Sequence, residues 1–180
     1  MNVVITGGAG FIGKQLAERL SKLGELPDAG GKPAKIDEIV LFDAVEGPPP
    51  APGRVPYRSV TGDVADRALM RKIIAGAVGA VFHLAAVVSA AAEADFDLGM
   101  RVNLEGTLSV LEACRALPKP PRVVFSSSVA VFGGDMPPVL TDVTPLTPQT
   151  SYGIQKAMGE LLVNDYSRKG FIDGRALRLP

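Results

Sequence analysis

Apolar residues along this chain fall into short runs that alternate with stretches of helical periodicity. The first run, residues 3–6, ends at a cluster of glycines, and residues 14–23 then place leucines on one side of a helix and charges on the other. Further buried strands are expected at residues 38–43, 57–60, 80–84, 122–128 and 174–180. Further helices are expected at residues 65–77, 95–117 and 151–169. This alternation predicts an α/β fold with a parallel sheet covered by helices on both faces.

Three segments rich in proline or glycine are expected to be loops. They are residues 26–35, 47–56 and 133–149. Strands and helices resume after each loop, so we expect one domain over all 180 residues. In the helix expected at 95–117, the inner side is predicted to carry Leu98, Val102, Leu108, Leu111 and Leu117.

The glycines after the first strand have the spacing of a nucleotide-binding turn. Gly7 permits a tight turn, Gly10 lets a pyrophosphate approach the backbone, and Gly13 lets helix and strand pack closely. Free N–H groups at the helix start then meet the phosphate charge. A strand-to-helix turn can also need glycine for geometry alone. The flanking strand and helix favour the nucleotide, and with it a doubly wound, Rossmann-like sheet.

The second buried strand ends in a carboxylate, Asp43. An aspartate at that position can accept both ribose hydroxyls of an adenosine and repels a 2′-phosphate, which favours NAD over NADP. In this motif the carboxylate usually lies about 20 residues after the last glycine. Here the separation between Gly13 and Asp43 is longer, because the loop at 26–35 intervenes. A strand-end aspartate that only closes a turn is the alternative.

Charge and composition narrow the set of partners. Nineteen basic and nineteen acidic residues cancel, so neither a nucleic acid nor an anionic membrane is an expected partner. Cys114 is expected to be a small buried hydrophobe in a reducing compartment. No basic segment precedes Val3, and residues 75–92 are too short and mixed to span a membrane. These features predict a cytoplasmic protein, and no metal site is predicted.

Hydroxyl and amino groups near the end of the chain form a candidate catalytic set. Tyr152 and Lys156 lie four residues apart, on one face of the expected helix. A tyrosine has a pKa of about 10, and a nearby ammonium and an oxidised nicotinamide both favour its phenolate. Ser128, at a strand end, adds a hydroxyl that can hold a substrate oxygen. His83 is the single histidine of the chain, and at the end of a buried strand it is expected to be structural.

Six motifs follow one another along the sequence: TGGAGFIG, GDV, HLAA, VNLEGT, FSSSVAVFGG and SYGIQK. Together they resemble the extended short-chain dehydrogenase/reductase family, which includes the NAD-dependent epimerases and dehydratases. The resemblance covers essentially the whole chain. It implies that Tyr152 is the acid/base, that Lys156 modifies its pKa and binds the nicotinamide ribose, and that Ser128 orients the substrate, with Ser89 as a further substrate contact.

The resemblance also implies a set of residues around the cofactor NAD. The set is Gly7, Gly10, Phe11, Ile12, Gly13, Asp43, Asp63, Val64, Leu84, Ala85, Ala86, Asn103, Tyr152, Lys156 and Pro180. Val129 and Ala130 stand where the family's dehydratases carry an Asp–Glu pair, which argues against dehydration.

Within the family, the chain most resembles dehydrogenases of small sugar acids. That resemblance implies NAD-dependent oxidation at a C2 hydroxyl, with D-erythronate as the expected substrate. A nucleotide-sugar epimerase is the alternative, and a non-catalytic NAD-sensing module is a third, although a sensor has no need of the phenolate. A homodimer is left open.

The sequence ends in the sixth expected strand, so we expect an N-terminal part of a longer enzyme, without its substrate-binding region. The residues expected near the substrate include Val88, Ser89, Ser128, Tyr152 and the turn at 133–134, and none of these is a cation, whereas a sugar acid brings a carboxylate. The groups that bind this carboxylate are therefore predicted to lie beyond Pro180.

Overall fold

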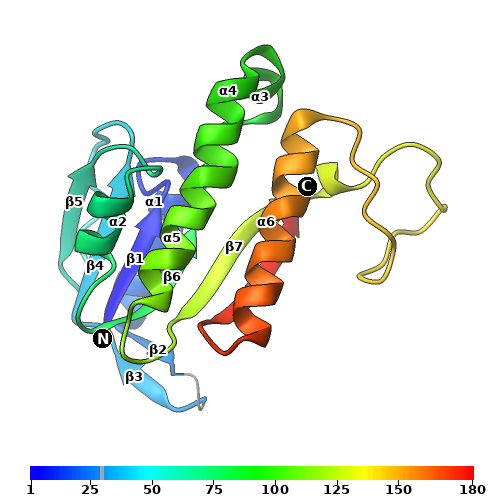
Figure 1. The fold of residues 1–180 in the computed structure, drawn as a ribbon. Coiled ribbons are helices and arrows are strands. Elements are labelled where there is room, and N and C mark those ends of the chain that lie inside the picture. The colour runs from blue at the N-terminus through cyan, green and yellow to red at the C-terminus, as the bar shows by residue number, and fades with distance from the viewer. Residues whose placement is uncertain (29–30) are drawn as a thin grey trace.

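The computed structural model describes residues 1–28 and 31–180 as a sheet flanked by helices (Figure 1). The strands of the large sheet are β1 (Asn2–Thr6), β4 (Glu38–Asp43), β5 (Tyr57–Thr61), β6 (Val78–His83), β7 (Arg122–Ser128) and β8 (Asp173–Leu179). They lie in the order β5-β4-β1-β6-β7-β8, and all neighbours are parallel. The order reverses direction at β1, which confirms the predicted doubly wound sheet.

Helical segments connect the strands. They are α1 (Phe11–Leu23), α2 (Arg67–Ile73), α3 (Ser89–Ala94), α4 (Phe96–Gly99), the π-helix η1 (Met100–Glu105), α5 (Gly106–Arg115), the 3₁₀ turn η2 (Val129–Val131) and α6 (Ser151–Arg168). In Figure 1, α2, α5 and α6 lie side by side over one face of the sheet. None of the helices in the described chain is long and apolar enough to cross a bilayer.

The core has two halves, one on each face of the sheet. Alternate residues of β1 divide between them: Val4 packs with residues of α2, α5 and α6, whereas Val3 and Ile5 pack with residues of α1. This division follows from the two-residue period of a strand. Cys114 lies fully buried in the first half, as predicted.

The predicted loop at residues 26–35 is wrong in part. Strands β2 (Glu25–Pro27) and β3 (Pro33–Lys35) form an antiparallel hairpin, while residues 29 and 30 lie outside the described residues. The prolines face each other at the closed end of the hairpin, where the ladder stops, so the missing proline N–H groups cost little pairing.

Two predicted helices differ from the observed ones. The helix expected at 65–77 is limited to α2, because the Asp66 carboxylate accepts hydrogen bonds from Ala68 and Leu69 and so caps it two residues later. The helix expected at 95–117 is instead α4, η1 and α5 in succession. Leu98, expected on its inner side, is 41% exposed because α4 rises above the sheet edge. The segment α3 was not predicted.

Candidate functional site

The glycine turn between β1 and α1 is closely packed. Gly7 has a φ of 73°, and a Cβ added there would lie 2.8 Å from the Ala85 amide nitrogen. At Gly13 an added Cβ would lie 2.2 Å from the Gly7 carbonyl oxygen. Glycine is therefore required at both positions, at the first for the left-handed backbone and at the second for helix–strand contact. Both roles agree with the sequence prediction.

The first turn of α1 faces the carboxyl edge of the sheet. Its N-cap, Gly10, makes no side-chain cap, and within the described residues the first turn holds no acidic side chain. Phe11 and Ile12 are exposed, at 82% and 51%. Backbone N–H groups at the positive end of a 13-residue helix suit a phosphate.

Two cavities lie along this edge. The Asp43–Asp63 cavity, of about 690 Å³, runs over the ends of β4 and β5. The Tyr152 cavity, of about 360 Å³, runs over the ends of β6 and β7. Both are lined by Gly7, Gly10, Leu84 and Ala86. The two cavities therefore form one groove with the glycine turn at its centre, which fits a dinucleotide with its pyrophosphate at the turn.

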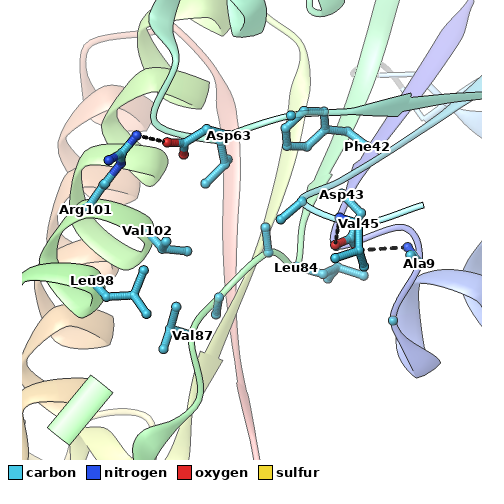
Figure 2. A pocket seen from close by; sticks show the side chains of 17 residues that line it. Ala9, Phe42, Asp43, Val45, Asp63, Leu84, Val87, Leu98, Arg101 and Val102 are labelled. Atoms are coloured by element: carbon cyan, nitrogen blue, oxygen red, sulfur yellow. Dashed lines mark hydrogen bonds and ion pairs between the residues drawn. The ribbon is translucent and has the colours of Figure 1, made fainter. Parts of the chain in front are cut away.

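Asp43 lies at one side of its cavity (Figure 2). Its Oδ2 accepts a hydrogen bond of 2.9 Å from the Ala9 amide, and its Oδ1 accepts one of 3.4 Å from Val45. These bonds hold the carboxylate at the end of β4, beside the glycine turn. A diol can donate to such a carboxylate, whereas a phosphate monoester at the same place meets its negative charge.

Asp63 lies at the other side of the same cavity, in an ion pair with Arg101 (Figure 2). Its Oδ1 accepts a hydrogen bond of 2.8 Å from the Ala65 amide. Val64 is buried beside it, and Leu98 and Val102 form the cavity wall across from Asp43 and Val45. The sequence prediction missed Leu98, Arg101 and Val102 as cavity residues, because helical periodicity gives no sign that α4 ends at Gly99 and that a π-turn carrying Arg101 and Val102 follows.

Ser128, Tyr152 and Lys156 all line the Tyr152 cavity. Lys156 is 2% exposed, and its Nζ donates a hydrogen bond of 2.7 Å to the Ser126 carbonyl oxygen. The same Nζ lies 4.8 Å from the ring centre of Phe125 and 5.7 Å from that of Tyr152. The Ser128 Oγ accepts a hydrogen bond from the Ala130 amide. Strand β7 and helix α6 thus bring the three predicted groups together.

Burial dominates the protonation of these groups. It lowers the pKa of Lys156 to about 8. It raises the pKa of the half-buried Tyr152, and the hydrogen bond with Ser128 opposes that rise. The sequence predicts that the ammonium and an oxidised nicotinamide together favour the phenolate of Tyr152. At Tyr152 the desolvation of the phenol is the largest cause of the shift, so its pKa lies above the ordinary value, and the Lys156 Nζ is directed at the Ser126 carbonyl oxygen.

Two of the predicted site residues line neither cavity. Asn103 is 2% exposed and bonds the backbone of Val87 twice, accepting from its N–H at 2.8 Å and donating to its carbonyl at 3.0 Å. It therefore shapes the loop along the groove without facing it. Ser89, the first residue of α3, is exposed and stands next to Val88, which lines the Tyr152 cavity.

His83 is a structural residue, as predicted. It is 1% exposed, its Nδ1 lies 2.7 Å from the Thr6 hydroxyl and its Nε2 lies 2.9 Å from the Thr107 hydroxyl. Because Thr107 donates its proton to the Asn103 carbonyl, it accepts from Nε2–H, and Thr6 then donates to Nδ1. Burial lowers the pKa of His83 to about 3, so the ring stays neutral.

A model of the NAD dependent epimerase/dehydratase family matches residues 3–180 of the chain. The chain belongs to this family. It is 58% identical over 180 residues to the D-erythronate dehydrogenase of Cupriavidus necator, a match that covers 100% of this chain and 55% of the relative. It is 45% identical over 181 residues to the D-erythronate dehydrogenase of Haemophilus influenzae, covering 100% and 54%.

A crystal structure of a nucleoside-diphosphate-sugar epimerase from Agrobacterium tumefaciens is also similar. Its TM-score is 0.89 at 42% identity, and the match covers 100% of this chain and 52% of that chain. The family predicted from the motifs is confirmed, and with it NAD as the family's cofactor. The chain spans about half the length of the curated relatives it matches.

Proposed function

We propose that this chain is the NAD-binding and catalytic part of a dehydrogenase that oxidises D-erythronate to 2-dehydro-D-erythronate. The observation that carries the proposal is the convergence of Ser128, Tyr152 and Lys156 on a cavity continuous with the glycine turn. The 58% identity to a D-erythronate dehydrogenase supports this sugar acid as the substrate. The 42% identity to a nucleotide-sugar epimerase keeps the epimerase as the second candidate.

In this proposal the groove holds the cofactor from end to end. Asp63 and Val64 receive the base, Asp43 the adenosine ribose, and the first turn of α1 the pyrophosphate. Lys156 and Tyr152 receive the nicotinamide ribose in the Tyr152 cavity. Asp43 selects NAD against NADP, because a 2′-phosphate beside it brings two negative charges together.

The chemical step needs a base, a positioned hydroxyl and an electron acceptor. Ser128 donates a hydrogen bond to the C2 oxygen of the substrate, and Tyr152, as phenolate, takes the hydroxyl proton. Bound NAD would supply the acceptor for the hydride that leaves C2, so that the carbon–oxygen single bond of the substrate becomes a carbonyl. The Lys156 ammonium, which is protonated below a pKa of about 8, stabilises the phenolate that burial disfavours.

The substrate carboxylate lacks an evident partner in the described part of the Tyr152 cavity. Lys156 is the one cation among the residues that line it, and its Nζ bonds the Ser126 carbonyl. A carboxylate normally calls for arginine, lysine or free backbone N–H groups. The cytoplasmic location stays a prediction, and a homodimer stays open.

Removing the phenol oxygen of Tyr152 tests the proposed acid–base role. Tyr152→Phe in the full-length protein removes the phenol oxygen, and we expect kcat with D-erythronate to fall by roughly 10²–10⁴-fold while NAD affinity changes little. Tyr166→Phe is the matched control, since Tyr166 lies about four turns further along α6 and its hydroxyl bonds Glu112. Near-normal turnover in Tyr152→Phe, measured by NADH formation, contradicts the proposed mechanism.

A further inference from the structure

We propose that Arg101 is a positioning residue for the cofactor base: its ion pair with Asp63 holds that carboxylate toward the adenine amino group and sets the preference for adenine. The inference rests on the proposed function, because it concerns the NAD site. Arg101 and Asp63 both line the Asp43–Asp63 cavity, on the same side of it (Figure 2).

Both oxygens of the Asp63 carboxylate are engaged. Oδ1 accepts from the Ala65 amide at 2.8 Å, and Oδ2 pairs with the Arg101 guanidinium. A carboxylate held at two points does not rotate freely, yet each oxygen keeps a further lone pair. Such a group is an oriented acceptor, which suits an exocyclic amino group and disfavours an exocyclic carbonyl. Adenine carries an amino group at that position, and hypoxanthine carries a carbonyl.

The backbone around Arg101 is fixed without the ion pair. An added Cβ at Gly106 would lie 2.5 Å from Val64 Cγ1, so the helix already touches the turn that carries Asp63. Further along, the Ser109 hydroxyl lies 3.2 Å from the Ala65 carbonyl oxygen. The Arg101 side chain is 63% exposed, and an ion pair with that exposure contributes little to folding. Its removal therefore leaves the helix docked and frees only the carboxylate.

The position of Arg101 argues against a phosphate-binding role. Figure 2 shows Arg101 and Asp63 on one side of the cavity, and Asp43 with the Ala9 amide on the other. Asp43 marks the ribose side, next to the glycine turn where the pyrophosphate is expected. Arg101 thus lies at the base end of the groove, and its charge is paired with Asp63.

The π-helix explains how this arginine reaches the cavity. A π-turn is wider than an α-turn and is frequent at functional sites. Within η1, Arg101 and Val102 line the cavity while Asn103, next in sequence, is buried against Val87. One short segment therefore supplies both the cavity wall and the anchor of the neighbouring loop.

Two dinucleotides that differ at one position of the base test the inference. The full-length protein is titrated with NAD and with nicotinamide hypoxanthine dinucleotide, as the unchanged protein and as Arg101→Met and Arg101→Lys. We expect Arg101→Met to lower the affinity for NAD by about fivefold to tenfold and the affinity for the hypoxanthine analogue by less than about twofold. The NAD affinity of Arg101→Lys, which keeps the charge, should lie between those of the unchanged protein and Arg101→Met. Arg168→Met is the control, since Arg168 is an exposed arginine in an ion pair on α6.

The outcomes separate this inference from the proposed function. Loss of adenine preference in Arg101→Met, with Arg168→Met unchanged, supports it. Equal weakening of both dinucleotides overturns it, because Arg101 then acts on the shared phosphates or on the fold. Unchanged affinities also overturn it, although the NAD site stands. An unchanged protein that binds neither dinucleotide contradicts the proposed function and removes this inference with it.

Discussion

Lys156 is a buried ammonium whose place in the chain is costly to the fold. It is 2% exposed, and its pKa of about 8 in the folded chain shows that the environment disfavours its charge. A fold keeps such a group where it serves a purpose, and here it lies beside a tyrosine that burial also keeps from ionising. Lys156 therefore destabilises the fold and at the same time serves the proposed chemistry.

Lys156→Met separates the two effects. In the folded state the pKa lies below its ordinary value of 10.5, so between about pH 8 and 10.5 the unfolded chain binds more protons, and the stability of the unchanged protein rises with pH there. We expect the variant to be more stable than the unchanged protein at pH 7, by about 1–3 kcal/mol, and this difference to shrink from pH 8 upward. Turnover and NAD affinity should both fall.

Urea unfolding of both proteins at pH 7 and pH 10 measures this difference. If Lys156→Met is less stable at pH 7 by more than about 1 kcal/mol, the lysine stabilises the fold and the account of its burial is wrong.

Most single site residues were predictable because short motifs carry them. Asp43 and Ser128 are the last residues of β4 and β7, and strand ends meet at one edge of a parallel sheet. Asn103 and Ser89 were placed less well. Motif position says that a residue is near a site, but whether its side chain faces the groove or the backbone of Val87 depends on the turns around it.

At the scale of elements, the β1–α1 unit needs two kinds of glycine. Gly24 ends α1 with a φ of 76°, and an added Cβ there meets nothing within 4 Å. Gly13, inside the helix, needs space and no special backbone, since its added Cβ meets the Gly7 carbonyl at 2.2 Å. The two positions separate the conformational cost of replacing glycine from the steric cost.

Gly13→Ala and Gly24→Ala form a matched pair in one helix. We expect Gly24→Ala to cost about 1 kcal/mol of unfolding free energy and to leave NAD affinity unchanged. Gly13→Ala should lower NAD affinity at least tenfold, because the start of α1 must shift away from the turn. Calorimetric titration and thermal unfolding give the two quantities. NAD affinity retained in Gly13→Ala rules out the close approach as the basis of the phosphate site.

Strand positions were predicted more closely than helix positions. Strands such as β4 and β7 contain short apolar runs, Ile39–Phe42 and Val123–Phe125, so the sequence alone locates them. The sequence alone did not locate the helices of the segment from α3 to α5, since its π-turn depends on contacts with Val64 and Val87 from other parts of the chain. The hairpin of β2 and β3 was missed because proline and glycine are common to loops and to the edges of short hairpins.

For the whole molecule, the sheet order and the groove along its carboxyl edge suit several reactions of the family. A dehydrogenase and an epimerase both need the phenol, the ammonium and the cofactor site. They differ in whether the reduced cofactor leaves or returns its hydride. The chain spans about half of the relatives' length and holds the proposed site, which would serve both reactions, so the fold alone does not distinguish them.

The products of the reaction distinguish a dehydrogenase from an epimerase. Full-length protein is mixed with NAD and either D-erythronate or UDP-galactose, and NADH is followed by absorbance while the UDP-sugar is analysed for inversion at C4. We predict NADH accumulation in proportion to the D-erythronate consumed, with no change in the UDP-sugar. Inversion of the UDP-sugar without net NADH, together with no NADH from D-erythronate, would contradict the proposed dehydrogenase and identify an epimerase.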